Sequence, residues 1–95
     1  MKIDFLDIAQ KELDDAFEWY EVQQKNLGKQ FIQEFSAALK RVVAYPEYNT
    51  LIDSEIRRCL IKRFPYGILY RVSSEVILII AIAHLHRKPN YWVGR

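Results

Sequence analysis

The longest apolar stretch of the chain runs from Val76 to Ala83 and is rich in β-branched residues. Ser73 to Glu75 precede it, and a basic segment, His84 to Pro89, follows it. A short apolar run with such boundaries indicates a buried strand. It is far shorter than the roughly 20 apolar residues of a membrane span. We therefore expect a sheet built around this strand, and no membrane partner.

Two further strands are predicted upstream of this run. Ile68 to Val72 should pair with it through the Ser-Ser turn as an antiparallel hairpin. Ile56 to Arg63 is the third candidate, and Phe64 to Gly67 separate it from the hairpin because proline and glycine interrupt strands. The C-terminal half should therefore form an antiparallel three-stranded meander. Tyr48 to Ser54 is interpreted as a loop or as an irregular lead-in to the second strand of the chain.

The N-terminus alternates polar and apolar residues from Lys2 to Leu6, with Ile3 and Phe5 on one side. This pattern predicts a short strand at the edge of the sheet. Asp7 follows directly, and an aspartate at this place is a suitable N-cap for a helix. The chain should therefore pass from an edge strand into a helix at Asp7.

Apolar residues then recur at three- and four-residue intervals in two segments, which predicts two amphipathic helices. The first should run to about Gln24. Asn26 to Gly28 interrupt the pattern, and the second helix should end near Tyr45, just before a proline. The short connection predicts an antiparallel helical hairpin. Each helix has one apolar face, so the pair should pack on the sheet in a single α+β domain, residues 1 to 95, of order β-α-α-β-β-β.

The net charge of +2 conceals an uneven distribution. Residues 1 to 50 contain six Lys or Arg and nine Asp or Glu, whereas residues 51 to 95 contain eight and three, so the halves carry −3 and +5. A basic sheet region favours an acidic partner or a nucleic acid. The acidic face of the first helix is expected to be solvated, without a catalytic role. Its residues are Glu12, Asp14, Asp15, Glu18 and Glu21.

Cysteine usage and short motifs narrow the class further. Cys59 is the single cysteine, so no internal disulfide can form, and no charged-then-apolar leader precedes the first helix. Both features favour a cytoplasmic protein. The chain has no glycine-rich phosphate loop, Walker pattern or Cys/His finger spacing, so no nucleotide cofactor is implied.

The residues that could take part in catalysis or binding lie at the end of the last predicted strand and just after it. His84 and His86 would point to one face if the strand continued through both, with Arg87 on the other. Histidine suits acid-base catalysis near neutral pH, and arginines could stabilise a phosphorane-like transition state, as RNA cleavage requires. The simpler interpretation is one histidine with a structural hydrogen bond and one exposed. A His-x-His pair without an obvious third ligand does not predict a metal site.

Basic and aromatic residues nearby allow two interpretations. The cations either contact phosphates or keep edge strands soluble. The aromatic residues either stack on bases or belong to the core. The cations are Arg57, Arg58, Lys62, Arg63 and Arg71, and the aromatic residues are Tyr66, Tyr91 and Trp92.

Four segments together resemble the RelE/ParE superfamily of bacterial type II toxins: FEWYEVQQ ending the first helix, LGKQF opening the second, IRRCLIKRFPYGILYRV, and AIAHLHRKPNYW. The resemblance extends over nearly the whole chain. It implies a helical hairpin against a small antiparallel sheet. It also implies a cognate antitoxin whose extended or helical C-terminal segment wraps and neutralises the toxin in a hetero-oligomer.

The superfamily has two activities. RelE-like members cleave messenger RNA on the ribosome, whereas ParE-like members poison DNA gyrase. Lys62 matches a basic strand position of the RelE type, and Arg87 falls near its C-terminal arginine. However, Ile68 or Leu69 stands where many RelE-like nucleases have an arginine. The segments FPYGILYRV and HxHRxPxYW resemble the ParE-like, or plasmid-stabilisation, branch.

The resemblance therefore favours a growth-arresting gyrase inhibitor that requires no cofactor. Its target-binding residues would be Arg63, His86, Arg87, Tyr91 and Trp92. The alternative is a ribosome-dependent RNase, with catalytic candidates Lys62, His84, His86 and Arg87. A third possibility is an interaction module without toxicity.

Overall fold

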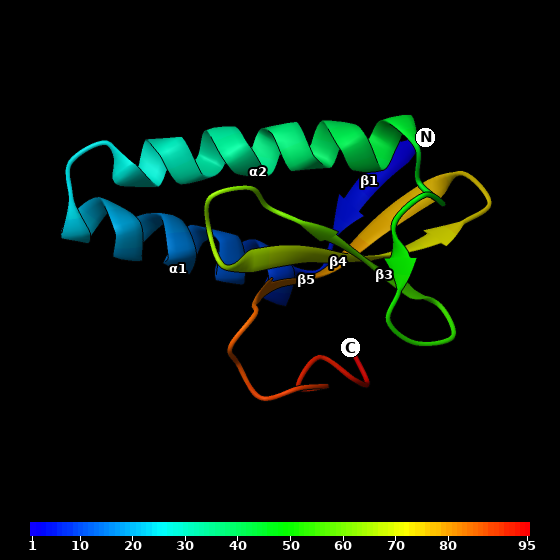
Figure 1. Cartoon of the computed structure of the whole chain (residues 1–95). Coiled ribbons are helices and arrows are strands. Elements are labelled where there is room, and N and C mark those ends of the chain that lie inside the picture. Colours follow the sequence, from blue (N-terminus) through cyan, green and yellow to red (C-terminus); the bar gives the residue numbers. More distant parts are fainter.

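The computed structural model describes residues 1 to 95. Two antiparallel helices, α1 (Asp7–Gln23) and α2 (Leu27–Ala44), lie across one face of a five-stranded sheet (Figure 1). The α+β class, the helical hairpin and both helix ends, near Gln24 and Tyr45, are confirmed. Neither helix combines the length and the apolar character that a membrane span needs.

The sheet has the order β1-β5-β4-β3-β2. Its three longest strands form the predicted antiparallel meander, and β1 lies at one edge as predicted, with Ile3 and Phe5 packed on the helix side. The edge strand runs parallel to β5, which its own sequence pattern could not show. The strands are β1 (Lys2–Phe5), β2 (Thr50–Leu51), β3 (Ile56–Leu60), β4 (Tyr66–Ser73) and β5 (Val76–His84).

Three strand predictions were wrong in detail. β4 begins at Tyr66 instead of Ile68, so Tyr66 and Gly67 pair within the sheet instead of separating the strands. Thr50 and Leu51, expected in a loop, pair with β3 as a two-residue strand, which is too short to show any periodicity. The third strand ends at Leu60 instead of Arg63, because the chain turns there: Arg63 has a φ of 72°, and the backbone N–H of Ile61 donates to the carbonyl of Tyr66.

The first helix begins without the predicted cap. Its N-cap residue is Leu6, and no side chain caps the helix. The N–H of Leu6 still donates to the carbonyl of Ile79 in the sheet, while its own carbonyl accepts from Ala9 and Gln10. Leu6 therefore ends the strand pairing and starts the helix at once. Asp7 lies in the first helical turn, where a carboxylate interacts favourably with the helix dipole.

The turn between the helices depends on Glu21 and Gly28. The Glu21 carboxylate accepts hydrogen bonds from the backbone N–H groups of Asn26, at 2.9 Å, and Gly28, at 3.0 Å. These donors open α2 and would otherwise lack partners. A Cβ on Gly28 would lie 2.6 Å from the carbonyl oxygen of Phe17, so glycine permits the close approach of the helices. The expectation that Glu21 is simply solvated was wrong.

The sheet is buried on both sides. On the helix side, a large apolar cluster includes Phe31, Ile68 and Tyr70. The other side, which we call the second side, is crossed by residues 85 to 95, the C-terminal segment (Figure 1). A smaller cluster lies beneath this segment. It consists of Ile56, Leu69, Ile80, Ala81, Ala83 and Trp92. Burial from both sides explains why β5 is a continuous apolar run.

Candidate functional site

Glu12 of α1 lies at the centre of a hydrogen-bond network. Arg95 donates to both carboxylate oxygens, from Nη1 to Oε1 at 2.7 Å and from Nη2 to Oε2 at 3.1 Å. The backbone N–H of Ile82 and the hydroxyl of Tyr91 each donate to the same carboxylate at 3.1 Å. A carboxylate offers about four acceptor positions, so these bonds satisfy it. The Glu12 side chain is only 13% exposed, and the expectation that it is solvated was wrong.

The position of this ion pair follows from the sheet. β1 ends at Phe5, while β5 continues past a bulge at Ile80, which has no partner on β4. Beyond β1, the N–H of Ile82 donates to Glu12, and Arg95 Nη1 donates to the carbonyl of Ile80 at 3.2 Å. The side chains of Glu12 and Arg95 therefore bond the backbone groups of β5 that a longer β1 would otherwise pair with.

Arg87 lies on the outside of the network. Its guanidinium carbon is 3.8 Å from the centroid of the Tyr91 ring, and its Nη1 is 3.8 Å from Glu12 Oε2. The guanidinium carbon of Arg95 is 5.0 Å from the same centroid. The Arg87 side chain is 55% exposed, whereas that of Arg95 is 13% exposed. Glu12 thus neutralises the less exposed arginine, Arg95, and leaves Arg87 accessible to a partner.

Tyr91 acts as a hydrogen-bond donor in this arrangement. Burial, with a further contribution from the Glu12 carboxylate, raises the pKa of Tyr91 to about 12, although Arg87 and Arg95 oppose the shift. A phenol with this pKa stays protonated near neutral pH. Tyr91 is therefore suited to packing and donation, and not to the role of general base.

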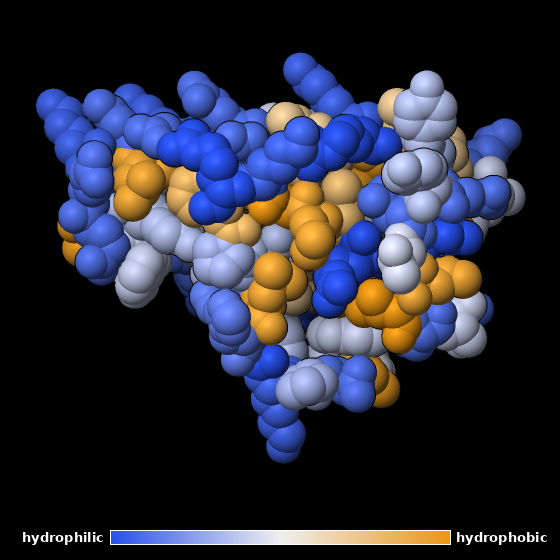
Figure 2. Space-filling model, in the orientation of Figure 1, coloured by the Kyte–Doolittle hydropathy of each residue, from blue (hydrophilic) through white to orange (hydrophobic).

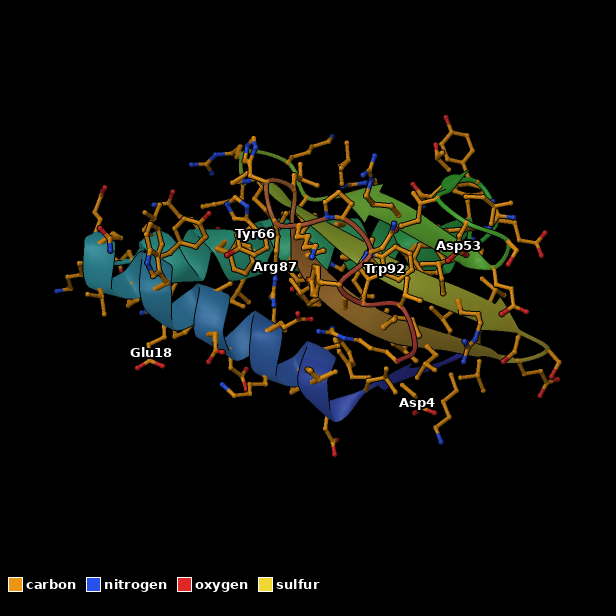
Figure 3. All side chains as sticks on the ribbon, turned by 90° about the horizontal axis from the view of Figure 1, so that it is seen from below. Asp4, Glu18, Asp53, Tyr66, Arg87 and Trp92 are labelled. Carbon is orange, nitrogen blue, oxygen red and sulfur yellow. The ribbon has the colours of Figure 1, made fainter.

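A groove of about 620 Å³ opens beside the network, between α1, one end of the β4–β5 hairpin and the C-terminal segment. Trp19, Tyr20 and Tyr66 contribute aromatic rings to its wall, and Arg87 and Tyr91 contribute from the C-terminal segment. Figure 3 shows Tyr66 and Arg87 near each other at this end of the molecule, whereas Glu18 points away from it. The groove thus combines aromatic surface with an accessible cation.

His84 lines this groove, and His86 lies next to His84. β5 ends at His84, so the strand does not continue through His86 and the alternation expected for a strand does not apply there. The backbone N–H of His86 donates to Nδ1 of His84 at 3.1 Å, and the rings lie 5.3 Å apart. The ring of His84 also packs edge-on against Tyr66, with centroids 5.0 Å apart. His84 therefore has a structural hydrogen bond and an aromatic neighbour.

Lys62 and Arg63 lie outside the groove. Lys62 lines a separate hollow near β2 and β3, with Arg58 among its neighbours. Arg63 is held to α2, where its Nη2 donates to Gln30 Oε1 at 2.9 Å. The structure thus brings together His84, His86, Arg87 and Tyr91 of the predicted residues, and does not bring Lys62 or Arg63 to them.

Trp92 and Arg71 also lie away from the groove. Trp92 is 8% exposed and packs from the C-terminal segment into the apolar cluster of the second side. Arg71 lies opposite Leu78, whereas His84 lies opposite Tyr66 at the other end of the hairpin, so Arg71 is remote from the histidines. No three His, Cys, Asp or Glu residues are placed to hold a metal ion.

Sequence reasoning missed Glu12 and Arg95. A signal for Glu12 was present: Ala9, Glu12, Leu13 and Ala16 follow the i, i+3, i+4, i+7 spacing of the apolar face, so the carboxylate faces inward. An acidic residue at such a position needs a cationic partner. The partner lies 83 residues away, and nothing in the spacing identifies it.

The fold is shared with a solved structure. The chain is similar to a structure described as the chromosomal ParDE TA system from P. aeruginosa, with a TM-score of 0.77 and 20% sequence identity. The match covers 90% of this chain and 96% of the other. No curated protein sequence is significantly similar to the chain.

The sequence itself gives the family. Residues 3 to 89 match the family model described as the ParE toxin of the type II toxin-antitoxin system, parDE. The chain therefore belongs to the ParE toxin family, which confirms the resemblance to the ParE-like branch.

Proposed function

We propose that this type II toxin acts in the cytoplasm by inhibiting DNA gyrase and is neutralised by a cognate antitoxin. The observation that carries the proposal is the exposed Arg87, stacked on Tyr91 beside the aromatic groove. Arginine and tyrosine are enriched among the residues that dominate protein interfaces. Membership of the ParE toxin family supports gyrase as the target.

The alternative is a ribosome-dependent RNase, which His84, His86 and Arg87 favour by lying close together at the end of β5. Lys62, the remaining catalytic candidate, lines a different hollow. Tyr91 donates a hydrogen bond to Glu12 and stacks against Arg87. A binding surface accounts for these positions more simply than a catalytic site does.

Growth and stability measurements test the toxin-antitoxin assignment. Induction of the free protein should arrest bacterial growth, and coexpression of the antitoxin should relieve the arrest. The antitoxin should also raise the melting temperature, because a partner that binds only the folded state stabilises it. Normal growth at verified expression would instead support an interaction module without toxicity.

A paired assay distinguishes the two targets. The purified protein should inhibit DNA supercoiling by gyrase, or trap cleaved DNA, and leave ribosome-bound messenger RNA intact. The same preparation is added to a translating extract at equal concentration. Codon-dependent cleavage of messenger RNA with unaffected gyrase would reverse the order of the two proposals.

Single variants distinguish a surface from a catalytic site. A binding surface should lose activity in a graded way across His86, Arg87 and Tyr91. Trp92 should act by holding the C-terminal segment in place, and Arg63, which lies outside the groove, should contribute least. His84→Gln should be tolerated, because an amide can form the same structural hydrogen bond. An RNase should lose roughly a hundredfold or more when its general acid or base is replaced. Abolition by His84→Gln in a folded protein, with Trp92→Ala active, would support the RNase.

A further inference from the structure

We propose that Glu12 is a positioning residue for target recognition, because its carboxylate fixes the C-terminal segment so that Arg87 and Tyr91 form one preformed surface. The inference rests on the proposed function, since it assigns Glu12 to the surface that contacts the target. The Glu12 side chain is mostly covered, with Arg87 and Tyr91 beside it, and need not touch the target.

The C-terminal segment has little regular structure of its own. It contains no helix or strand. Leu85 N–H donates to the carbonyl of Pro65 at the start of the segment, and the backbone bonds beyond it are short-range turns such as Val93 N–H to Asn90 and Arg95 N–H to Trp92. The position of the segment beyond Leu85 therefore depends mainly on side-chain contacts. Trp92 anchors it on the second side of the sheet, and Arg95 and Tyr91 anchor it to Glu12.

The Glu12 contacts join three parts of the molecule at one carboxylate. The residue belongs to α1, its Oε1 accepts from Ile82 of β5, and both oxygens accept from Arg95. A two-pronged arginine-carboxylate pair has a fixed geometry as well as charge. The pair therefore sets where the C-terminal segment lies relative to the rigid sheet.

The remaining acidic residues of α1 lack this arrangement. Asp14 accepts from Gln10, and Asp15 pairs with Lys11, both within the exposed face of the same helix. Glu18 is exposed and points away from the groove (Figure 3). Glu18 thus offers the same change of charge on the same helix without any contact to the C-terminal segment.

Preformed order matters for affinity. If the segment were free, its residues would have to be ordered when the target binds, and that loss of conformational freedom weakens binding. The charge arrangement contributes as well: Glu12 is matched by the mostly covered Arg95, while the exposed Arg87 side chain stacks on Tyr91. Loss of Glu12 would leave Arg87 and Arg95 without their common carboxylate.

The test uses Glu12→Gln, which preserves size and one acceptor but removes the charge, with Glu18→Gln as the matched control. Hydrogen exchange measured by mass spectrometry on the isolated protein reports the order of residues 85 to 95 separately from the helix-side core. Supercoiling inhibition is measured on the same preparations. Arg95→Gln removes the other partner and serves if Glu12→Gln does not fold.

The proposal predicts about tenfold or greater acceleration of exchange in residues 85 to 95 and about a tenfold rise in the half-inhibitory concentration, because charge-assisted hydrogen bonds are lost. The core amides should keep their protection, and Glu18→Gln should match the unchanged protein. In the double variant, Glu12→Gln with Arg95→Gln, the two effects should be less than additive, since both changes break one pair.

Three results would overturn the proposal. The segment could stay protected in Glu12→Gln; inhibition could fall no more than in Glu18→Gln; or the core could lose protection equally, which would show a role in stability alone. If the unchanged protein does not inhibit gyrase, the proposed function fails, and growth arrest replaces supercoiling as the activity measured. Hydrogen exchange needs no gyrase, so the two failures remain distinguishable.

Discussion

The two sides of the sheet differ in what covers them. The helix side carries two long helices and a large apolar cluster with packed aromatic rings. In this cluster the ring centroid of Phe31 lies 5.3 Å from those of both Phe64 and Tyr66. The second side carries a six-residue cluster and a segment without regular structure, held by Trp92 and by the Glu12 network. Most of the apolar core therefore lies on the helix side. The candidate target-binding residues Arg87 and Tyr91 lie on the segment that covers the second side.

Exposed hydrophobic residues are scattered over the surface. On the face drawn in Figure 2 they form separate groups between hydrophilic residues. Trp19 and Val22 are exposed on α1, and Leu51 and Leu60 on the strands near the sheet edge. Regions with few buried contacts open more readily than a core does. The second side should therefore respond to mutation locally, and the helix side globally.

The largest effect is expected from Phe31→Ala. Phe31 is fully buried at the centre of the aromatic cluster, so its truncation removes packing and leaves a cavity. The free energy of unfolding should fall by about 3 to 5 kcal/mol. Denaturant unfolding followed by circular dichroism measures this loss, and Val22→Ala on the exposed face of α1 is the control. Equal losses in both variants would contradict the assigned core.

Trp92→Ala should lower the free energy of unfolding less than Phe31→Ala does, but it should loosen the C-terminal segment more. The residue packs in the smaller cluster, whose covering segment can detach while the helix side stays folded. We expect a loss of about 1 to 3 kcal/mol. Hydrogen exchange should accelerate in residues 85 to 95 first. A cooperative loss of the whole fold, comparable to that of Phe31→Ala, would show that the two sides are equally important.

Gly28→Ala tests the close approach of the helices on the helix side. The added methyl group would meet the carbonyl oxygen of Phe17 at 2.6 Å and the Glu21 side chain at 3.0 Å, so α1 and α2 must separate. Alanine favours a helix by up to about 1 kcal/mol, which offsets part of the overpacking cost of about 1 to 3 kcal/mol. A net destabilisation of about 1 kcal/mol is expected by thermal unfolding. A stabilised variant would contradict this geometry.

The smallest expected effect is on how the free energy of unfolding depends on pH in the alkaline range. The pKa of Tyr91 rises from 10.0 to about 12 in the folded protein, so between these values the unfolded chain loses its phenolic proton and the folded chain keeps it. The stability that Tyr91 contributes is complete below pH 10 and is lost as the pH rises through about 12. The unfolding free energy of Tyr91→Phe should depend less on pH in this window. An unchanged dependence would contradict the assigned environment.

Much of the fold was predictable because burial leaves a pattern. The run from Val76 to Ala83 indicated a strand buried on both sides, and the helices showed their apolar faces. The two-residue β2 could not be found, because two residues carry no period. The parallel pairing of β1 with β5 arises from the path of the chain through the helices, which local patterns do not record.

The site was only partly predictable. Arg87 and Tyr91 stood out by residue type and by family resemblance, and the structure places them together. Glu12 was assigned to solvent because its neighbours in sequence are acidic and exposed, yet its spacing puts it beside Ala9 and Leu13. Its ion pair with Arg95 depends on where the C-terminal segment lies, which only tertiary structure determines.

The central claim is that the C-terminal segment presents Arg87 as the main contact to gyrase. The most direct test compares the half-inhibitory concentrations of Arg87→Ala and Lys88→Ala in a supercoiling assay. Both changes remove one positive charge from adjacent exposed positions, but only Arg87 stacks on Tyr91. We expect Arg87→Ala to raise this concentration at least about tenfold, as for an interface hot spot, and Lys88→Ala to leave it within about twofold. Equal effects of the two variants, or full inhibition by Arg87→Ala, would contradict the claim.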